Sequence, residues 1–239
     1  MTKRFGIFTL MAFILMLIMC KSKVEEPTGK PSIYVEKTDY YKHPKSDKQL
    51  PFKYRLEYYH ENGNPHRWQK LDSTYKVLTD YIYQYDNTWK HTGALYSENS
   101  DPDYGIEKVR FENDSTQITE WIDSIGAVYY TMTDNLNKAG KTYRAEFKGD
   151  EIHGYDSTFY TKEGFVERIF FTNIKGKVFN DRQFEYDEVN EYGDWISRRK
   201  IMNDTIRELQ IREIIYRGES IPINAIYDQK ILGEIDKSE

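Results

Sequence analysis

The chain has very little cysteine, proline and long apolar sequence. Of its 239 residues, one is cysteine and seven are proline. A single thiol excludes an internal disulfide and a site built from several thiolates, so the fold depends on its packed core. An excess of positive charge is also missing, because 34 Lys and Arg stand against 39 Asp and Glu, a net charge of −5. This balance argues against a nucleic-acid polyanion as the main partner.

One apolar run stands near the N-terminus. Residues 5–19 are apolar apart from Gly6 and Thr9, and they follow Lys3 and Arg4. A run of about 15 residues is short for a membrane-spanning helix, which needs roughly 20, and suits the core of a signal peptide. We therefore expect residues 1–19 to form an N-terminal signal helix.

The end of this run resembles a known processing signal. Leu17-Ile18-Met19-Cys20 resembles the lipobox of bacterial lipoproteins, although Met19 stands where Gly, Ala or Ser is usual. The resemblance implies cleavage before Cys20, acylation of its thiol and lipid anchoring in the cell envelope, at the outer membrane, on either its surface or its periplasmic face. An uncleaved N-terminal helix and plain secretion are the alternatives. Without residues 1–19 the chain has 32 Lys and Arg against 39 Asp and Glu, a charge of −7.

The sequence changes character near residue 50. Residues 20–50 are polar and contain Pro27, Gly29, Pro31 and Pro44, which predicts a tether between the lipid and a folded domain. We expect an all-β domain over residues 51–216 and a packed C-terminal extension over residues 217–239.

The predicted strands rest on alternation and aromatic content. The chain has 21 Tyr, 12 Phe and 4 Trp, which are residues that favour strands. Phe52, Tyr54, Leu56 and Tyr58 alternate with charged residues before Asn62-Gly63, a strong hairpin signal. Similar segments recur about every ten residues, which predicts an antiparallel meander of hairpins.

Two patterns suggest internal repeats. Asp-Ser-Thr begins at Asp72, Asp114 and Asp156, in steps of 42 residues, which indicates either a degenerate repeat or coincidence. Residues 184–188 and 192–199 together resemble the Tyr-Asp-x-x-Gly-Asn-Trp pattern of RHS/YD-like repeats in Bacteroidetes-type lipoproteins, with an insertion at 189–191. This resemblance implies a curved or rolled repeat sheet and no enzymatic activity.

The sequence contains no motif that requires catalysis. None of the five histidines has the spacing of a metal motif, although His60 and His66 flank one turn and could face each other. Solvated turn histidines are the alternative to a two-histidine metal site. No serine, histidine and acid spacing forms a catalytic set, and acidic residues are too common for their pairs to indicate a glycosidase. We therefore predict no enzyme, no catalytic residue, no metal and no cofactor.

Aromatic side chains are the best binding candidates. Trp68, Trp89, Trp121 and Trp195 could stack on a sugar ring or on a protein partner. The alternative is that each fills the core or covers a sheet edge. The sequence thus favours a non-enzymatic, lipid-anchored envelope protein that binds or spaces something, with the membrane contacted through lipid and no nucleic acid. A glycan-binding accessory lipoprotein and a repeat protein related to toxin delivery or immunity are the alternatives.

Overall fold

A computed structural model describes residues 29–41, 50–98, 105–149, 152–202 and 204–219. The expected signal helix, Cys20 and most of the C-terminal extension lie outside these ranges. The described residues form fourteen strands: β1 (Pro31–Tyr40), β2 (Lys53–Tyr59), β3 (Pro65–Leu71), β4 (Val77–Tyr85), β5 (His91–Glu98), β6 (Gly105–Asn113), β7 (Thr116–Ile122), β8 (Val128–Leu136), β9 (Thr142–Gly149), β10 (His153–Tyr160), β11 (Val166–Asn173), β12 (Val178–Val189), β13 (Trp195–Met202) and β14 (Thr205–Tyr216).

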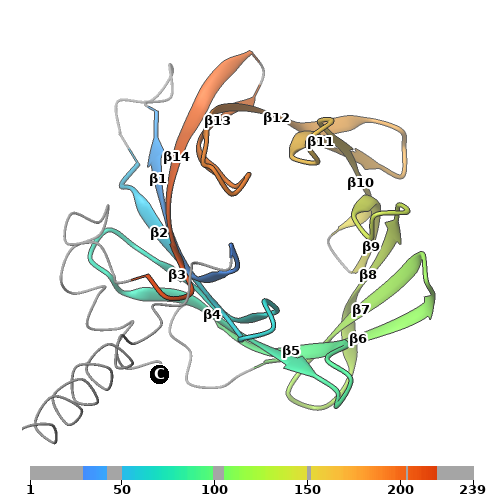
Figure 1. Ribbon diagram of the computed structural model, residues 1–239. Coiled ribbons are helices and arrows are strands. Elements are labelled where there is room, and N and C mark those ends of the chain that lie inside the picture. The colour runs from blue at the N-terminus through green and yellow to red at the C-terminus, as the bar shows by residue number, and fades with distance from the viewer. Residues whose placement is uncertain (1–28, 42–49, 99–104, 150–151, 203, 220–239) are drawn as a thin grey trace, which may run out of the picture.

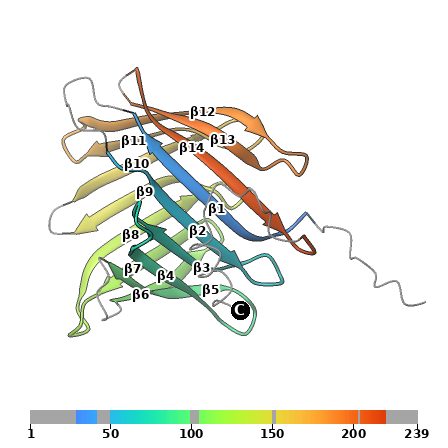
Figure 2. The same cartoon turned by 90° about the vertical axis from the view of Figure 1, so that its left-hand side faces the viewer.

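The strands close into a barrel. Each strand pairs antiparallel with the next along the chain, and β1 pairs with β14 to complete the ring. Figure 1 looks down this ring, with β1 beside β14. The closing ladder runs from Pro31 opposite Tyr216 to Tyr40 opposite Glu208. Figure 2 shows the strands crossing the wall obliquely, as closure requires.

Closure corrects one prediction and confirms another. The all-β antiparallel meander is confirmed, but the open curved or rolled repeat sheet is wrong, because the first and last strands hydrogen-bond to each other. The physical reason is that an open sheet of fourteen strands leaves two unpaired edges, and closure satisfies both. The Oγ of Ser32 also donates to the carbonyl of Ile215 at 3.0 Å, which adds a side-chain contact at the seam.

The strand that closes the barrel lies within the predicted tether. Residues 31–40, assigned to a tether over residues 20–50, instead form β1 and pair with both β14 and β2. Val35 is fully buried and packs with Leu56, which explains why the charged segment is held in place. The barrel therefore spans residues 31–216 and not 51–216.

Six of the described turns that join the strands share one local design. The Oδ1 atom of Asn137 accepts hydrogen bonds from the backbone N–H groups of Ala139 and Lys141, at 2.9 and 3.0 Å. Gly140 then adopts a φ of +73°, which a glycine takes without steric cost. The first residue accepts in the same way in the turns that begin at Asp72, Asp86, Asp123, Asn173 and Asn190.

The 42-residue spacing does not mark a repeated turn. Asp72 begins a turn, whereas Asp156 lies within β10, where its carboxylate pairs with Arg182 at 3.2 Å. The regularity of the chain instead comes from hairpins of similar length.

Candidate functional site

Contacts that pass over an intervening strand identify the inner face of the wall. Side chains converge on the concave side of a barrel, so such contacts form there. The Tyr81 hydroxyl on β4 donates to Glu107 Oε1 on β6 at 2.5 Å, passing over β5. Arg182 on β12 reaches Asp156 on β10 in the same way, over β11. The cross-strand partners of these residues share the inner face.

Aromatic rings line much of this inner face. One row of partners runs from Glu57 through Trp68 and Tyr81 to Tyr96, and Trp68 stacks on Tyr81 with ring centroids 5.5 Å apart. A neighbouring row joins Trp121 to Tyr130, with centroids 5.0 Å apart. We call the following seven residues the aromatic wall: Trp68, Tyr81, Tyr83, Trp121, Tyr130, Phe147 and Phe171.

Glycines allow two inner rings to lie against the backbone. A Cβ atom added at Gly149 would come within 2.5 Å of the Tyr130 ring, and one at Gly105 would come equally close to the Tyr96 ring. Because no side chain occupies these positions, each ring covers its glycine. The arrangement fixes the position of the ring on the wall.

The inner rings remain partly accessible. Trp68, Tyr81, Trp121, Tyr130 and Phe147 are half-buried, although they face the inside of a closed ring. Barrels of about eight strands are filled by their own side chains, whereas larger ones leave room for ligand or water. Fourteen strands with half-buried inner rings therefore leave aromatic surface accessible inside the ring.

An arginine cluster adjoins the aromatic wall at the closing seam. Arg212 Nε donates to Glu36 Oε2 at 3.0 Å, and its guanidinium lies 3.5 Å from the Trp195 ring centroid. Arg198 approaches the same ring at 4.0 Å. We define the arginine cluster as Arg55, Arg198, Arg212, Glu36 and Glu57, in which Arg55 pairs with Glu57 at 3.0 Å.

Burial alters the titration of several inner groups. Burial raises the pKa of the Glu107 carboxyl above its usual value, and the hydrogen bond from Tyr81 opposes this effect. Burial also raises the pKa of Asp134. In contrast, it lowers the pKa of the Arg198 guanidinium, an effect that the nearby Glu36 opposes. These directions follow from burial, since Glu107 is 4% and Asp134 6% exposed.

Two histidines meet in a pocket beside the hairpin turns. His66 Nδ1 lies 3.2 Å from His60 Nε2, so the structure brings these two residues together. Burial, His60 and Arg67 lower the pKa of His66. The pocket has a volume of about 440 Å³ and is lined by His60, His66, Tyr83, Tyr85, Asp86, Asn87 and Trp89. Among the described residues, no group of three or more His, Cys, Asp or Glu side chains could hold a metal ion.

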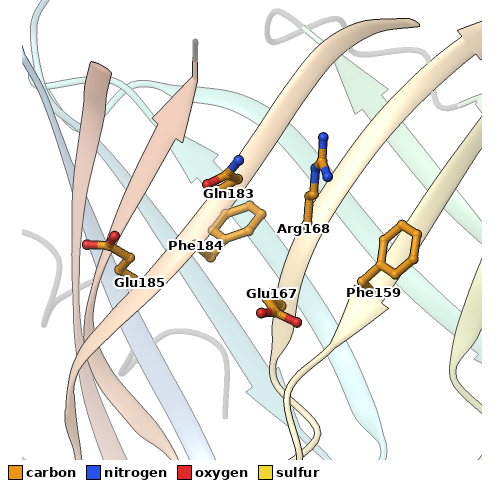
Figure 3. A pocket seen from close by; sticks show the side chains of 6 residues that line it. All are labelled: Phe159, Glu167, Arg168, Gln183, Phe184 and Glu185. Atoms are coloured by element: carbon orange, nitrogen blue, oxygen red, sulfur yellow. The ribbon is translucent and has the colours of Figure 1, made fainter. Parts of the chain in front are cut away.

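Another pocket, of about 460 Å³, lies at the wall between β10, β11 and β12. In Figure 3, Arg168 stands between Gln183 and Phe159, which are its cross-strand partners. Its guanidinium already makes two hydrogen bonds to Asp181, at 2.9 and 2.6 Å. Because that cation is paired, this pocket is a weaker candidate for binding than the inner wall.

The four tryptophans selected from the sequence have different environments. Trp68 and Trp121 lie on the inner wall, and Trp195 is buried between two arginines. Trp89 is half exposed in the turn between β4 and β5. Its φ of +63° is one that glycine takes in similar turns.

The sequence patterns do not single out the inner tyrosines or the arginine cluster. Tyr81 and Tyr83 lie two residues apart on one strand face, but nothing local in the sequence indicates that this face points inward. Arg198 and Arg212 meet at Trp195 only because β13 and β14 pair next to the closing seam. Charged residues at alternate positions in aromatic strands are a signal that could have indicated Arg198 and Arg212.

Comparisons with known proteins do not establish a family. No family model and no curated protein matches the chain. Among solved structures, it resembles a porin-like protein from Bacteroides uniformis, with a TM-score of 0.41 and 7% identity over 77% of this chain and 98% of the other. In the described part of the chain, no helix has the length and apolar character to cross a bilayer.

Proposed function

We propose that this chain is a lipid-anchored envelope protein whose barrel binds a saccharide on its inner wall. The observation that carries the proposal is the aromatic wall, whose half-buried rings face the inside of a closed barrel. Sugar rings have apolar faces that stack on aromatic side chains and hydroxyls that need hydrogen-bond partners. The wall supplies both, because Tyr81 and Glu107 lie among its rings.

The closed topology favours a saccharide over an extended peptide. Peptides are commonly bound as an added strand at a free sheet edge. In this barrel β1 and β14 pair with each other, so the ring offers no such edge. The net charge of −5 also disfavours a nucleic acid.

A titration of neutral oligosaccharides tests the proposal. We expect at least one member of a panel to change the tryptophan fluorescence of the barrel, and Trp121→Ala to weaken that binding by about tenfold. The matched control is Phe159→Ala, which removes a ring that is 49% exposed and lies opposite Arg168. Equal affinity of the Trp121 variant and the native chain for every ligand would contradict the proposal.

The outer rows of β6–β13 support a barrel that is tethered in water. Membrane-spanning barrels carry an apolar band about 25 Å tall on their outer face. The outer rows of β6–β13 are instead rich in charge, with Arg144 41% and Glu146 53% exposed. The charged outer residues include Lys108, Arg110, Glu120, Arg144, Glu146, Lys148, Arg168, Asp181, Glu185 and Arg199.

The mode of anchoring can be tested by exchanging the N-terminal segment. We expect the native chain to sediment with the membranes and to carry acyl chains on Cys20, as the mass of its mature N-terminus would show. Replacement of residues 1–20 by a cleavable secretory signal peptide should release the barrel into the soluble fraction. A barrel that stays in the membrane after this exchange would rule out the lipid as its anchor.

A further inference from the structure

Arg198 is a cation inside the barrel that lacks a direct counter-charge. Its Nε donates to Gln210 Oε1 at 2.5 Å, and its Nη1 lies 3.4 Å from the Tyr186 hydroxyl. Within the described ranges, no carboxylate oxygen lies within 4.0 Å of its nitrogens. An unpaired charge away from bulk water is unfavourable unless something supplies the opposite charge.

Aromatic rings hold the Arg198 guanidinium in position. It lies 4.0 Å from the Trp195 ring centroid and 4.7 Å from that of Phe184. Cation–π contacts of this kind fix the plane of a guanidinium and leave its N–H edge free to bind. Arg198 is half-buried, so part of its side chain remains accessible.

The local charge balance also favours an anion. The arginine cluster contains three guanidiniums and two carboxylates, and Glu36 is committed to Arg212 through a hydrogen bond of 3.0 Å. The neighbouring inner cations are paired, since Lys200 contacts Glu208 at 2.5 Å and Arg182 contacts Asp156 at 3.2 Å. Among these cations of β12 and β13, Arg198 has no carboxylate oxygen of the described residues within 4.0 Å and therefore offers a place for an incoming anion.

We propose that Arg198 binds the carboxylate of an acidic saccharide whose rings stack on the neighbouring aromatic wall. This inference rests on the proposed function and narrows it to uronate-type sugars. A planar guanidinium matches a carboxylate with two parallel hydrogen bonds, which is stronger and more specific than a single neutral one. The ring faces and the cation thus contact different parts of one ligand.

Galacturonate oligomers and their methyl esters provide a matched pair of probes. Esterification removes the charge and keeps the sugar rings. We expect the full-length barrel to bind the free acid about tenfold more tightly than the ester by calorimetric titration. Arg198→Gln should abolish this preference and leave the binding of the ester unchanged.

Adjacent residues supply the controls. Arg199 follows Arg198 on β13 but points outward and pairs with Asp187 at 2.6 Å, so Arg199→Gln should keep the preference for the acid. Arg198→Lys keeps the charge without the planar fork and should lose most of the preference, which provides a second variant if the first does not fold. Folding is checked for each variant by circular dichroism.

The outcomes separate the two proposals. Equal binding of acid and ester by the native barrel, or an acid preference that survives in Arg198→Gln, would overturn the anion site and leave saccharide binding intact. If neither probe binds and no neutral oligosaccharide does, the proposed function itself fails. If sulfate at equal charge inhibits the binding of the free acid, the site is a general anion site. That result would contradict its specificity for uronates.

Discussion

Replacing Glu36 by alanine is expected to lower the free energy of unfolding by about 3 kcal/mol. The Glu36 side chain is 8% exposed and that of Arg212 is 19% exposed, so their ion pair lies largely out of water. Removal of the carboxylate takes this partner from the Arg212 guanidinium, which lies 3.5 Å from the Trp195 ring centroid. A buried charge that loses its partner is among the costliest single changes.

Two further variants define the cause of this loss. Glu36→Gln keeps an acceptor for the Arg212 Nε and should lose less stability than Glu36→Ala. Asp187→Ala removes a carboxylate from Arg199 on the outer face, where the paired side chains are 34% and 36% exposed, and should cost at most about 1 kcal/mol. Denaturant unfolding of the four proteins measures these differences. Equal losses for Glu36→Ala and Asp187→Ala would mean that the cluster is not shielded from water.

Gly93→Ala is expected to destabilise the barrel by roughly 3 kcal/mol. A Cβ atom at this position would overlap the backbone oxygen of Glu107 on β6, and Gly93 has a φ of +154°. The clash is with backbone, which cannot rotate away, so β5 and β6 would have to separate. Because Tyr81 bonds to Glu107, the change should also disturb the aromatic wall.

A turn glycine is the control for Gly93→Ala. Gly140 has a φ of +73°, and a Cβ atom there would meet nothing within 4 Å, so Gly140→Ala should cost only about 1 kcal/mol of backbone strain. Thermal and denaturant unfolding of both variants make the comparison. Similar losses at the two positions would show that β5 and β6 can adjust without separating.

Much of the hairpin meander is readable from local sequence. The Asn62-Gly63 turn forms, with the N–H of Gly63 donating to the carbonyl of His60 at 2.8 Å. The segment 206–216, at the end of the predicted all-β domain, lies within β14. Such features depend on neighbours along the chain, which is why alternation and turn residues reveal them.

Closure was not readable, because it depends on contacts between the two ends. Ser32 and Ile215 are 183 residues apart, and neither segment carries a local sign of its partner. The prolines and charges around residues 31–40 instead favoured a tether. With β1 overlooked, neither the ring nor its inner face could be inferred.

The functional residues show the same division between local and distant information. Arg198-Arg199-Lys200 stands out in the sequence as a short basic run. In the barrel its members alternate, so that Arg198 and Lys200 face inward and Arg199 faces outward. The sequence locates the basic run. Only the pairing of β12, β13 and β14 shows that Arg198 lacks a carboxylate partner among the described residues while Arg199 and Lys200 each have one.

Fluorescence from one tryptophan on each side of the wall tests the central claim most directly. One variant keeps Trp121 and has phenylalanine at Trp68, Trp89 and Trp195; the other has phenylalanine at all four sites and carries Phe159→Trp on the outer face. Each is titrated with an oligosaccharide that binds the native barrel, in the presence of a soluble quencher. We predict that the ligand shields Trp121 and leaves the tryptophan at position 159 unaffected. Shielding of the outer tryptophan alone would contradict binding on the inner wall.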